Sequence, residues 1–113
     1  MPVMVDGLDA VSTAALNGDI DAVADTSIDL WIALGNEVRW LNANPAAACY
    51  TSTHSVYSEA IDLLHESMDQ ISDGALYYDV DLINSGTELM LLGNAKLSQA
   101  TAGVPASTVA CGL

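Results

Sequence analysis

The stretch Tyr50–Tyr78, with the sequence YTSTHSVYSEAIDLLHESMDQISDGALYY, decides the fold of this chain. Its core-type positions recur in alternating steps of four and three residues, at Tyr50, His54, Tyr57, Ile61, Leu64, Met68, Ile71, Ala75 and Tyr78. Serine and acidic residues fill most of the positions between them. This period is typical of one long amphipathic helix with an apolar stripe and a solvated back. We therefore expect a helical protein organised around this segment.

Two shorter helices are predicted before this segment. Residues 6–17 have helical periodicity, and Asn17-Gly18 should end that helix because glycine is the usual left-handed residue past a helix C-terminus. Asp19 is the expected N-cap of the second helix. The apolar stripe of the second helix consists of Ile20, Ala24, Ser27, Trp31, Leu34, Val38 and Leu41.

Asn44-Pro45 separates the second helix from the third. The residue before proline is disfavoured in the helical region, whereas proline is tolerated at the first helical position. Asn44 is thus the predicted N-cap of a third helix that runs to about residue 77. Asp79 caps a fourth helix that runs to about residue 102 and is closed by Gly103 and Pro105. Large and small residues alternate in its stripe, which predicts close approach to a neighbouring helix: Ile83, Gly86, Met90, Gly93, Leu97 and Ala100.

These segments predict an all-α, up-down-up-down four-helix bundle in one domain, residues 1–113, with a short first helix and a long third helix. The stretch 15–21 (ALNGDID) resembles the stretch 75–81 (ALYYDVD), which suggests two repeated hairpins, 1–44 and 45–103. Convergent capping chemistry is the alternative explanation. The first helix is long enough to cover only half of its neighbours.

The charge of the chain excludes several classes of partner. Fifteen acidic residues face only Arg39 and Lys96, which gives a net charge of −13. Nucleic acids and anionic membrane surfaces repel such a chain. No apolar run is long enough to span a bilayer, so membrane insertion is not expected either. Basic proteins, cations and water are the natural partners.

The two cysteines, Cys49 and Cys111, are predicted to form a disulfide bond. In the up-down topology the fourth helix ends beside the start of the third, and the tail 104–113 can fold back and bring Cys111 to Cys49. A disulfide bond indicates an oxidising compartment, hence a secreted or surface-exposed protein. The first residues lack the character of a signal peptide. A cytoplasmic protein and a mature fragment with an added Met both remain open.

Acidic residues gather at the end of the bundle that carries the first and third connections. Asp25 and Asp73 lie there, as do the residues that are weak candidates for a calcium-type metal site: Asp19, Asp21, Asp79 and Asp81. N-capping and compensation of the helix dipole explain the same residues. His54 and His65 are three helical turns apart, too far to share a metal ion.

No catalytic motif, cofactor motif or family signature is present. The aromatic residues are candidates for an apolar ligand pocket, with packing in the core as the alternative: Trp31, Trp40, Tyr50, Tyr57, Tyr77 and Tyr78. The first hypothesis is a non-enzymatic, secreted or surface-exposed bundle that acts through protein–protein contact or self-association. One alternative is a cytosolic acidic inhibitor, of the immunity-protein or DNA-mimic type, that binds a basic partner. Another is a bundle that binds a small ligand or a cation.

Overall fold

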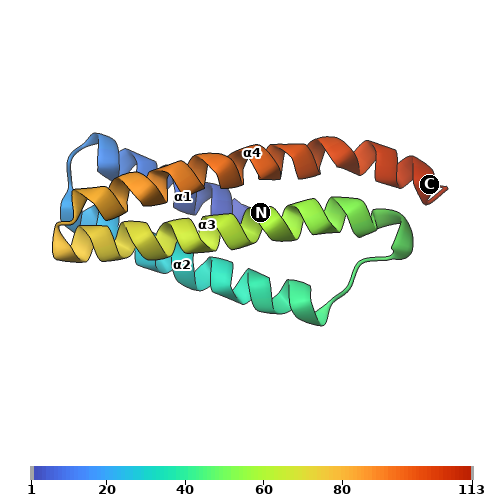
Figure 1. Cartoon of the computed structure of the whole chain (residues 1–113), viewed down its shortest axis with the longest axis horizontal. Coiled ribbons are helices and arrows are strands. Elements are labelled where there is room, and N and C mark those ends of the chain that lie inside the picture. The colour runs from blue at the N-terminus through green and yellow to red at the C-terminus, as the bar shows by residue number, and fades with distance from the viewer. Residues whose placement is uncertain (1, 113) are drawn as a thin grey trace.

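The computed structural model describes residues 2–112, leaving aside the side chains of residues 2–6, 107, 108 and 110. Four α-helices run up, down, up and down in an elongated molecule of 50 × 24 × 22 Å (Figure 1). A single 3₁₀ turn, η1 (Ala48–Tyr50), directly precedes the third helix. The helices are α1 (Pro2–Leu16), α2 (Ile20–Ala43), α3 (Thr51–Tyr77) and α4 (Val80–Ala110). The predicted all-α four-helix architecture is confirmed.

Helix α3 is the centre of the bundle. It packs against α2 on one side and against α4 on another, while α1 packs on α2. Within residues 2–112, no Cα atom of α1 comes within 8 Å of a Cα atom of α4. The ring of four helices is therefore open between its first and last members. Figure 1 also shows that the N-terminus of α1 reaches only the middle of the molecule.

The core follows the predicted stripe of α3. Ile61, Leu64 and Met68 are fully buried, and the stripe continues through Ile71 and Ala75. Leucine side chains of α2, with Val11 of α1, cover it. Burying each large aliphatic side chain stabilises the fold by about 1.5–3 kcal/mol, so this stripe is the main source of the stability of the bundle.

Glycines bring α4 close to α3, as the alternating stripe predicted. A Cβ atom on Gly86 would lie 2.9 Å from the carbonyl oxygen of Ser67, and one on Gly93 would lie 2.8 Å from Leu64 Cδ2. The Ser67 hydroxyl donates a 2.6 Å hydrogen bond to the Gly86 carbonyl. Leu64 and Ile71 of α3 fill the space beside these glycines.

The two turns at one end have the same conformation. Gly18 and Tyr78 both adopt positive φ angles, of 67° and 54°. The amide of the following aspartate donates to a carbonyl five residues earlier in each turn, a pattern that ends a helix. Asp19 then accepts a hydrogen bond from the Ala22 amide, and Asp79 accepts from the amides of residues 81 and 82. Both aspartates are N-caps, as predicted.

Two predicted helix boundaries are wrong, one at the start of the chain and one at Pro45. α1 begins at Pro2 rather than near residue 6. Asn44 does not cap α3: its side-chain amide donates to the Trp40 carbonyl and so closes α2. The chain then passes Pro45 without helix and enters α3 through η1. Asn44 satisfies an exposed carbonyl at one helix end rather than an amide at the next.

The predicted end of the fourth helix is also wrong. α4 continues through Gly103 and Pro105 to Ala110, so the tail 104–113 does not fold back. A proline inside a helix removes the hydrogen bond to the carbonyl four residues earlier. Pro105 and Thr101 are both exposed, so water can replace that bond and the helix continues.

Candidate binding grooves

An apolar groove lies in the opening between α1 and α4, and we call it the seam groove. Its cavity has a volume of about 390 Å³. Val11, Val23 and Ile71 are buried, at 2–4% exposure, whereas Leu16 is 89% exposed. The lining residues are Val11, Ser12, Ala15, Leu16, Gly18, Ile20, Val23, Ile71, Ile83, Thr87 and Met90.

Glycines allow each outer helix to pack closely on its own neighbour, and the seam groove remains open between α1 and α4. Gly7 of α1 lies against Leu30 of α2, where an added Cβ atom would come within 2.8 Å of Leu30 Cδ1. On the other side, Gly86 and Gly93 draw α4 onto α3. Each outer helix is thus tied to its own neighbour in the chain. The groove is the space that this pairing leaves.

The acidic residues are segregated along the molecule, a feature that the sequence analysis missed. All fifteen lie within residues 6–37 and 59–88, and the segments 38–58 and 89–113 contain none. The fold brings the two turns to one end and the α2–α3 connection and C-terminus to the other (Figure 1). The molecule therefore has an acidic half and an end that contains no acidic residue. The spacing of acids in the sequence is a signal that could have revealed this.

The seam groove belongs to the acidic half. Asp19 lies between the lining residues Gly18 and Ile20, and Glu88 follows Thr87. Neither cation lines the groove. Lys96 instead lies 3.5 Å from Glu59, between α4 and α3. An apolar floor is thus combined with a surface that attracts positive charge.

A second groove, which we call the disulfide-end groove, lies where α1 no longer covers the stripe of α3. Tyr50, His54 and Tyr57 are half-buried here, although they continue the same stripe as the fully buried Ile61 and Leu64. The volume of the groove is about 330 Å³. It is lined by Ala46, Tyr50, Thr53, His54, Tyr57, Ala100, Thr101 and Val104.

Two polar groups face the disulfide-end groove. The Tyr57 hydroxyl donates a 3.0 Å hydrogen bond to Glu37 Oε1. Burial first, then this bond and the negative charge of Glu37, raise the pKa of the Tyr57 phenol. His54 Nε2 is buried without a hydrogen-bond partner among the described residues. Such an atom costs about 1–3 kcal/mol, which marks the groove as an incomplete surface.

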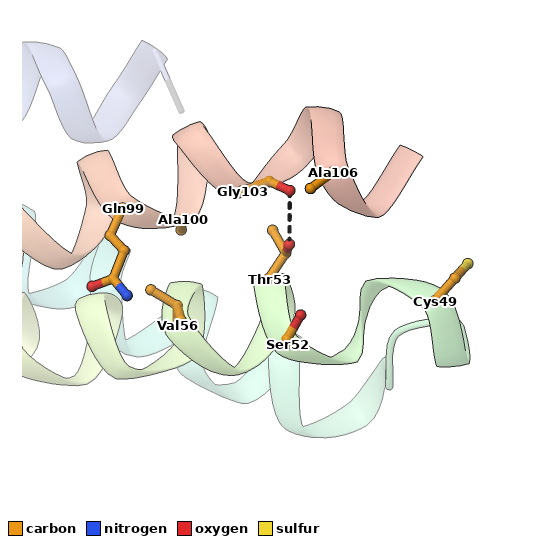
Figure 2. Close-up of a pocket in the computed structure, with 8 residues that line it drawn as sticks. All are labelled: Cys49, Ser52, Thr53, Val56, Gln99, Ala100, Gly103 and Ala106. Carbon is orange, nitrogen blue, oxygen red and sulfur yellow. Dashed lines mark hydrogen bonds between the residues drawn. The ribbon is translucent and has the colours of Figure 1, made fainter. Parts of the chain in front are cut away.

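A third hollow, of about 400 Å³, lies between α3 and α4, with Cys49 at one edge of it (Figure 2). Small side chains such as Ser52, Gly103 and Ala106 line it, and Thr53 Oγ1 donates a weak 3.4 Å hydrogen bond to the Gly103 carbonyl. The Cys49–Cys111 disulfide bond joins η1 to the segment just past α4, with Cα atoms 5.3 Å apart. The predicted cysteine pairing is confirmed, but it is reached by a longer helix and not by a returning tail.

The candidate metal ligands do not form a site in the described part of the chain. Asp19 and Asp79 serve as N-caps, with Asp21 and Asp81 in the first turns that follow. Among the described side chains, no group of three or more His, Cys, Asp and Glu residues could hold a metal ion.

The histidines and aromatic residues are spread over different surfaces. His65 stacks on Trp31, with ring centroids 5.4 Å apart, whereas His54 lies in the disulfide-end groove. Trp40 is exposed on α2, and Tyr77 and Tyr78 are exposed at the turn end. The six candidate aromatic residues therefore do not share one pocket: only Tyr50 and Tyr57 of them line the disulfide-end groove.

Within residues 2–112, no helix combines the length and apolar character needed to cross a membrane. Comparisons with protein-family models, curated proteins and solved structures found no match to this chain. Functional inference therefore depends on the grooves and on the distribution of charge.

Proposed function

We propose that this protein is a non-enzymatic binding protein that acts outside the cytoplasm and holds a helix of a basic protein partner in the seam groove. The observation that carries the proposal is an apolar groove with a buried floor inside the acidic half of a chain of net charge −13. Amphipathic helices bind such grooves through apolar residues spaced at i, i+3, i+4 and i+7. Lysine and arginine residues on the flanks of the helix would face the acidic surface, which speeds association.

The chemistry of the seam groove favours binding over catalysis. Among the described side chains that line it, none carries a carboxylate, imidazole, thiol or amine, and Ser12 and Thr87 contribute the only hydroxyls. The Thr87 hydroxyl donates to the Ile83 carbonyl within α4. General acid–base and nucleophilic catalysis both need a titratable or activated group at the site. A helix face needs only apolar surface and complementary charge.

The disulfide bond supports a location outside the cytoplasm, because such bonds persist in oxidising compartments. The acidic-inhibitor alternative shares the basic partner but requires a reducing cytosol. Thiol labelling of the denatured, unreduced protein from its natural source distinguishes the two. Blocked cysteines support the secreted or surface-exposed protein, and two free thiols would contradict it.

Peptide binding tests the groove itself. A leucine–lysine peptide designed as an amphipathic helix should bind in isothermal titration calorimetry, and its affinity should fall as salt rises. A scrambled peptide of the same composition and a leucine–glutamate helix serve as controls, and both should bind at least tenfold more weakly. Equal binding of all three peptides would contradict the proposal.

A matched pair of α1 variants locates the binding surface. Ala15 lines the seam groove and Thr13 does not, although both residues are exposed. Ala15→Arg should weaken peptide binding at least tenfold, whereas Thr13→Arg, which adds the same charge two residues away, should leave it nearly unchanged. Circular dichroism melts establish that both variants fold. Equal effects of the two variants would argue for binding by charge alone.

A further inference from the structure

The disulfide-end groove is an unfinished part of the core. The stripe of α3 is fully buried from Ile61 to Met68, and it becomes half-buried from Tyr57 back to Tyr50. The change occurs because α1 is only 15 residues long and its N-terminus lies near the middle of the molecule (Figure 1). The stripe continues, but the helix that would cover it does not.

Further apolar side chains are exposed at the same end of the molecule. Val104 lines the groove and is 44% exposed, while Trp40 at the end of α2 and Val109 on α4 are 57% and 76% exposed. Exposed apolar side chains gathered at one end of a molecule favour contact with another macromolecule.

The distribution of charge identifies the partner that fits this end. The residues that line the groove lie in the segments 38–58 and 89–113, which contain Arg39 and Lys96 but no acidic residue. Glu37, which accepts the hydrogen bond from Tyr57, is an acidic residue at the border of the groove. Two copies that met through their acidic halves would bring many carboxylates together. Two copies that met through the ends without acidic residues would place the acidic halves at opposite poles. The molecule is 50 Å long, so much of the acidic half would lie beyond the Debye length of about 8 Å.

We propose that two copies of this chain associate through their disulfide-end grooves in a two-fold symmetric contact. In such an isologous contact the same surface serves both copies. The α3 stripe of each copy, at Tyr50, His54 and Tyr57, packs against the exposed Thr101 and Val104 face of the other copy's α4. Each copy then supplies the cover that α1 is too short to give. The seam grooves stay open at the two ends of the dimer, so the inference does not depend on the proposed function.

Sedimentation equilibrium tests the association. In about 150 mM sodium chloride, with loading concentrations from low to high micromolar, the average mass should rise from that of one chain to that of two. A single-chain mass throughout would overturn the proposal. Stable association into species larger than two would also overturn it, because an isologous contact closes at the dimer.

Two glutamate variants identify the contact surface. Thr101 lines the groove and is exposed, whereas the neighbouring Ala102 is also exposed but lines none of the three hollows. Thr101→Glu should raise the dimer dissociation constant at least tenfold. Ala102→Glu adds the same charge to the same turn of α4 and should change the constant by less than threefold. Equal effects of both substitutions would refute the proposed contact.

The histidines of the unmodified chain give a readout that does not depend on any variant. On dilution through the dissociation range, the imidazole NMR signals of His54 should shift. Those of His65, which stacks on Trp31 away from the groove, should stay constant. Dissociation that moves the His65 signals and leaves those of His54 unchanged would place the contact elsewhere and overturn the inference.

Discussion

At the scale of single residues, Tyr57 joins α3 to α2 and lies at the border between the covered and the open part of the core. Its hydroxyl donates to Glu37, and its pKa is raised by burial first and by Glu37 second. The folded protein therefore keeps this phenol neutral at a pH where the unfolded chain ionises it. Burial of this phenol, reinforced by the hydrogen bond and the charge of Glu37, thus makes the stability of the fold depend on pH in the alkaline range.

Tyr57→Phe should make the free energy of unfolding depend less on pH in the alkaline range. The stabilisation from the raised pKa is fully present below about pH 10, the ordinary tyrosine value, and is lost as the pH rises through the folded-state pKa. Because the variant lacks the hydrogen bond to Glu37, its free energy of unfolding at neutral pH should also be lower by about 1 kcal/mol. Urea unfolding at pH 7, 9 and 10.5 measures both effects. Tyr77→Phe, at a 77% exposed position, is the control, and parallel slopes for Tyr57→Phe and the unmodified protein would refute the explanation.

Tyr78 offers a second test at the residue scale. It adopts a φ angle of 54° while its side chain is 74% exposed, whereas Gly18 occupies the equivalent position in the other turn. A left-handed conformation costs an L-residue about 1–2 kcal/mol. Tyr78→Gly should therefore raise the free energy of unfolding by about 1 kcal/mol in urea titrations. Tyr77→Gly, one residue earlier and inside α3, should lower it by a similar amount. Destabilisation by both substitutions would show that the Tyr78 side chain makes a stabilising contribution.

At the scale of secondary-structure elements, the α3–α4 pair is the rigid unit of the bundle and α1 is its least supported helix. Backbone atoms of the pair come close enough for Ser67 to bond directly to the Gly86 carbonyl. Within residues 2–112, the Cα atoms of α1 come within 8 Å of those of α2 but not of those of α3 or α4. We therefore expect α1 to exchange amide hydrogens faster than the middle of α3, since local opening is easiest where buried contacts are few.

Gly86→Ala should weaken the α3–α4 contact. The added Cβ atom would lie 2.7 Å from Ile71 Cγ1 and 2.9 Å from the Ser67 carbonyl oxygen, and the backbone oxygen can move only if the helices separate. Overpacking of this kind costs about 1–3 kcal/mol. Thermal and urea unfolding measure the loss of stability. Ser85→Ala, at the neighbouring exposed position, is the control. A Gly86→Ala variant at least as stable as the control would mean that the helices do not approach this closely.

At the scale of the whole molecule, the net charge of −13 is concentrated in one half of the bundle. Like charges in a compact domain repel one another, and salt screens the repulsion. The same concentration of charge that fits a basic partner therefore destabilises the isolated protein. Stability and binding should respond to salt in opposite directions.

Raising sodium chloride from about 10 mM to 1 M should raise the melting temperature clearly. Calcium chloride at equal ionic strength should add nothing further, because no metal-binding group is formed by the described side chains. Differential scanning calorimetry with both salts measures the effect. A melting temperature independent of sodium chloride would refute the repulsion argument. A melting temperature that rises further in calcium chloride than in sodium chloride would indicate that the aspartates of the two turns bind calcium.

The sequence by itself determined the features that depend on neighbouring residues. The heptad spacing predicted the α3 stripe, and Asp19 and Asp79 could be identified as N-caps because a cap acts within one helical turn. Gly86 and Gly93 predicted close helix approach, since a helix stripe tolerates glycine at a cost that packing must offset. The cysteine pairing followed from the up-down order of the helices.

Only the tertiary structure decided the features that depend on distant segments. Asn44 bonds backward to α2 and α4 passes Pro105, because both outcomes depend on exposure and not on local propensity. The seam groove exists because Gly7 allows α1 to pack closely on α2, while the glycines of α4 allow α4 to pack closely on α3. The acidic half exists because two segments far apart in the chain, 6–37 and 59–88, fold side by side. Periodicity sets which face of a helix is buried, but packing between distant helices sets what that face meets and where the core stays open.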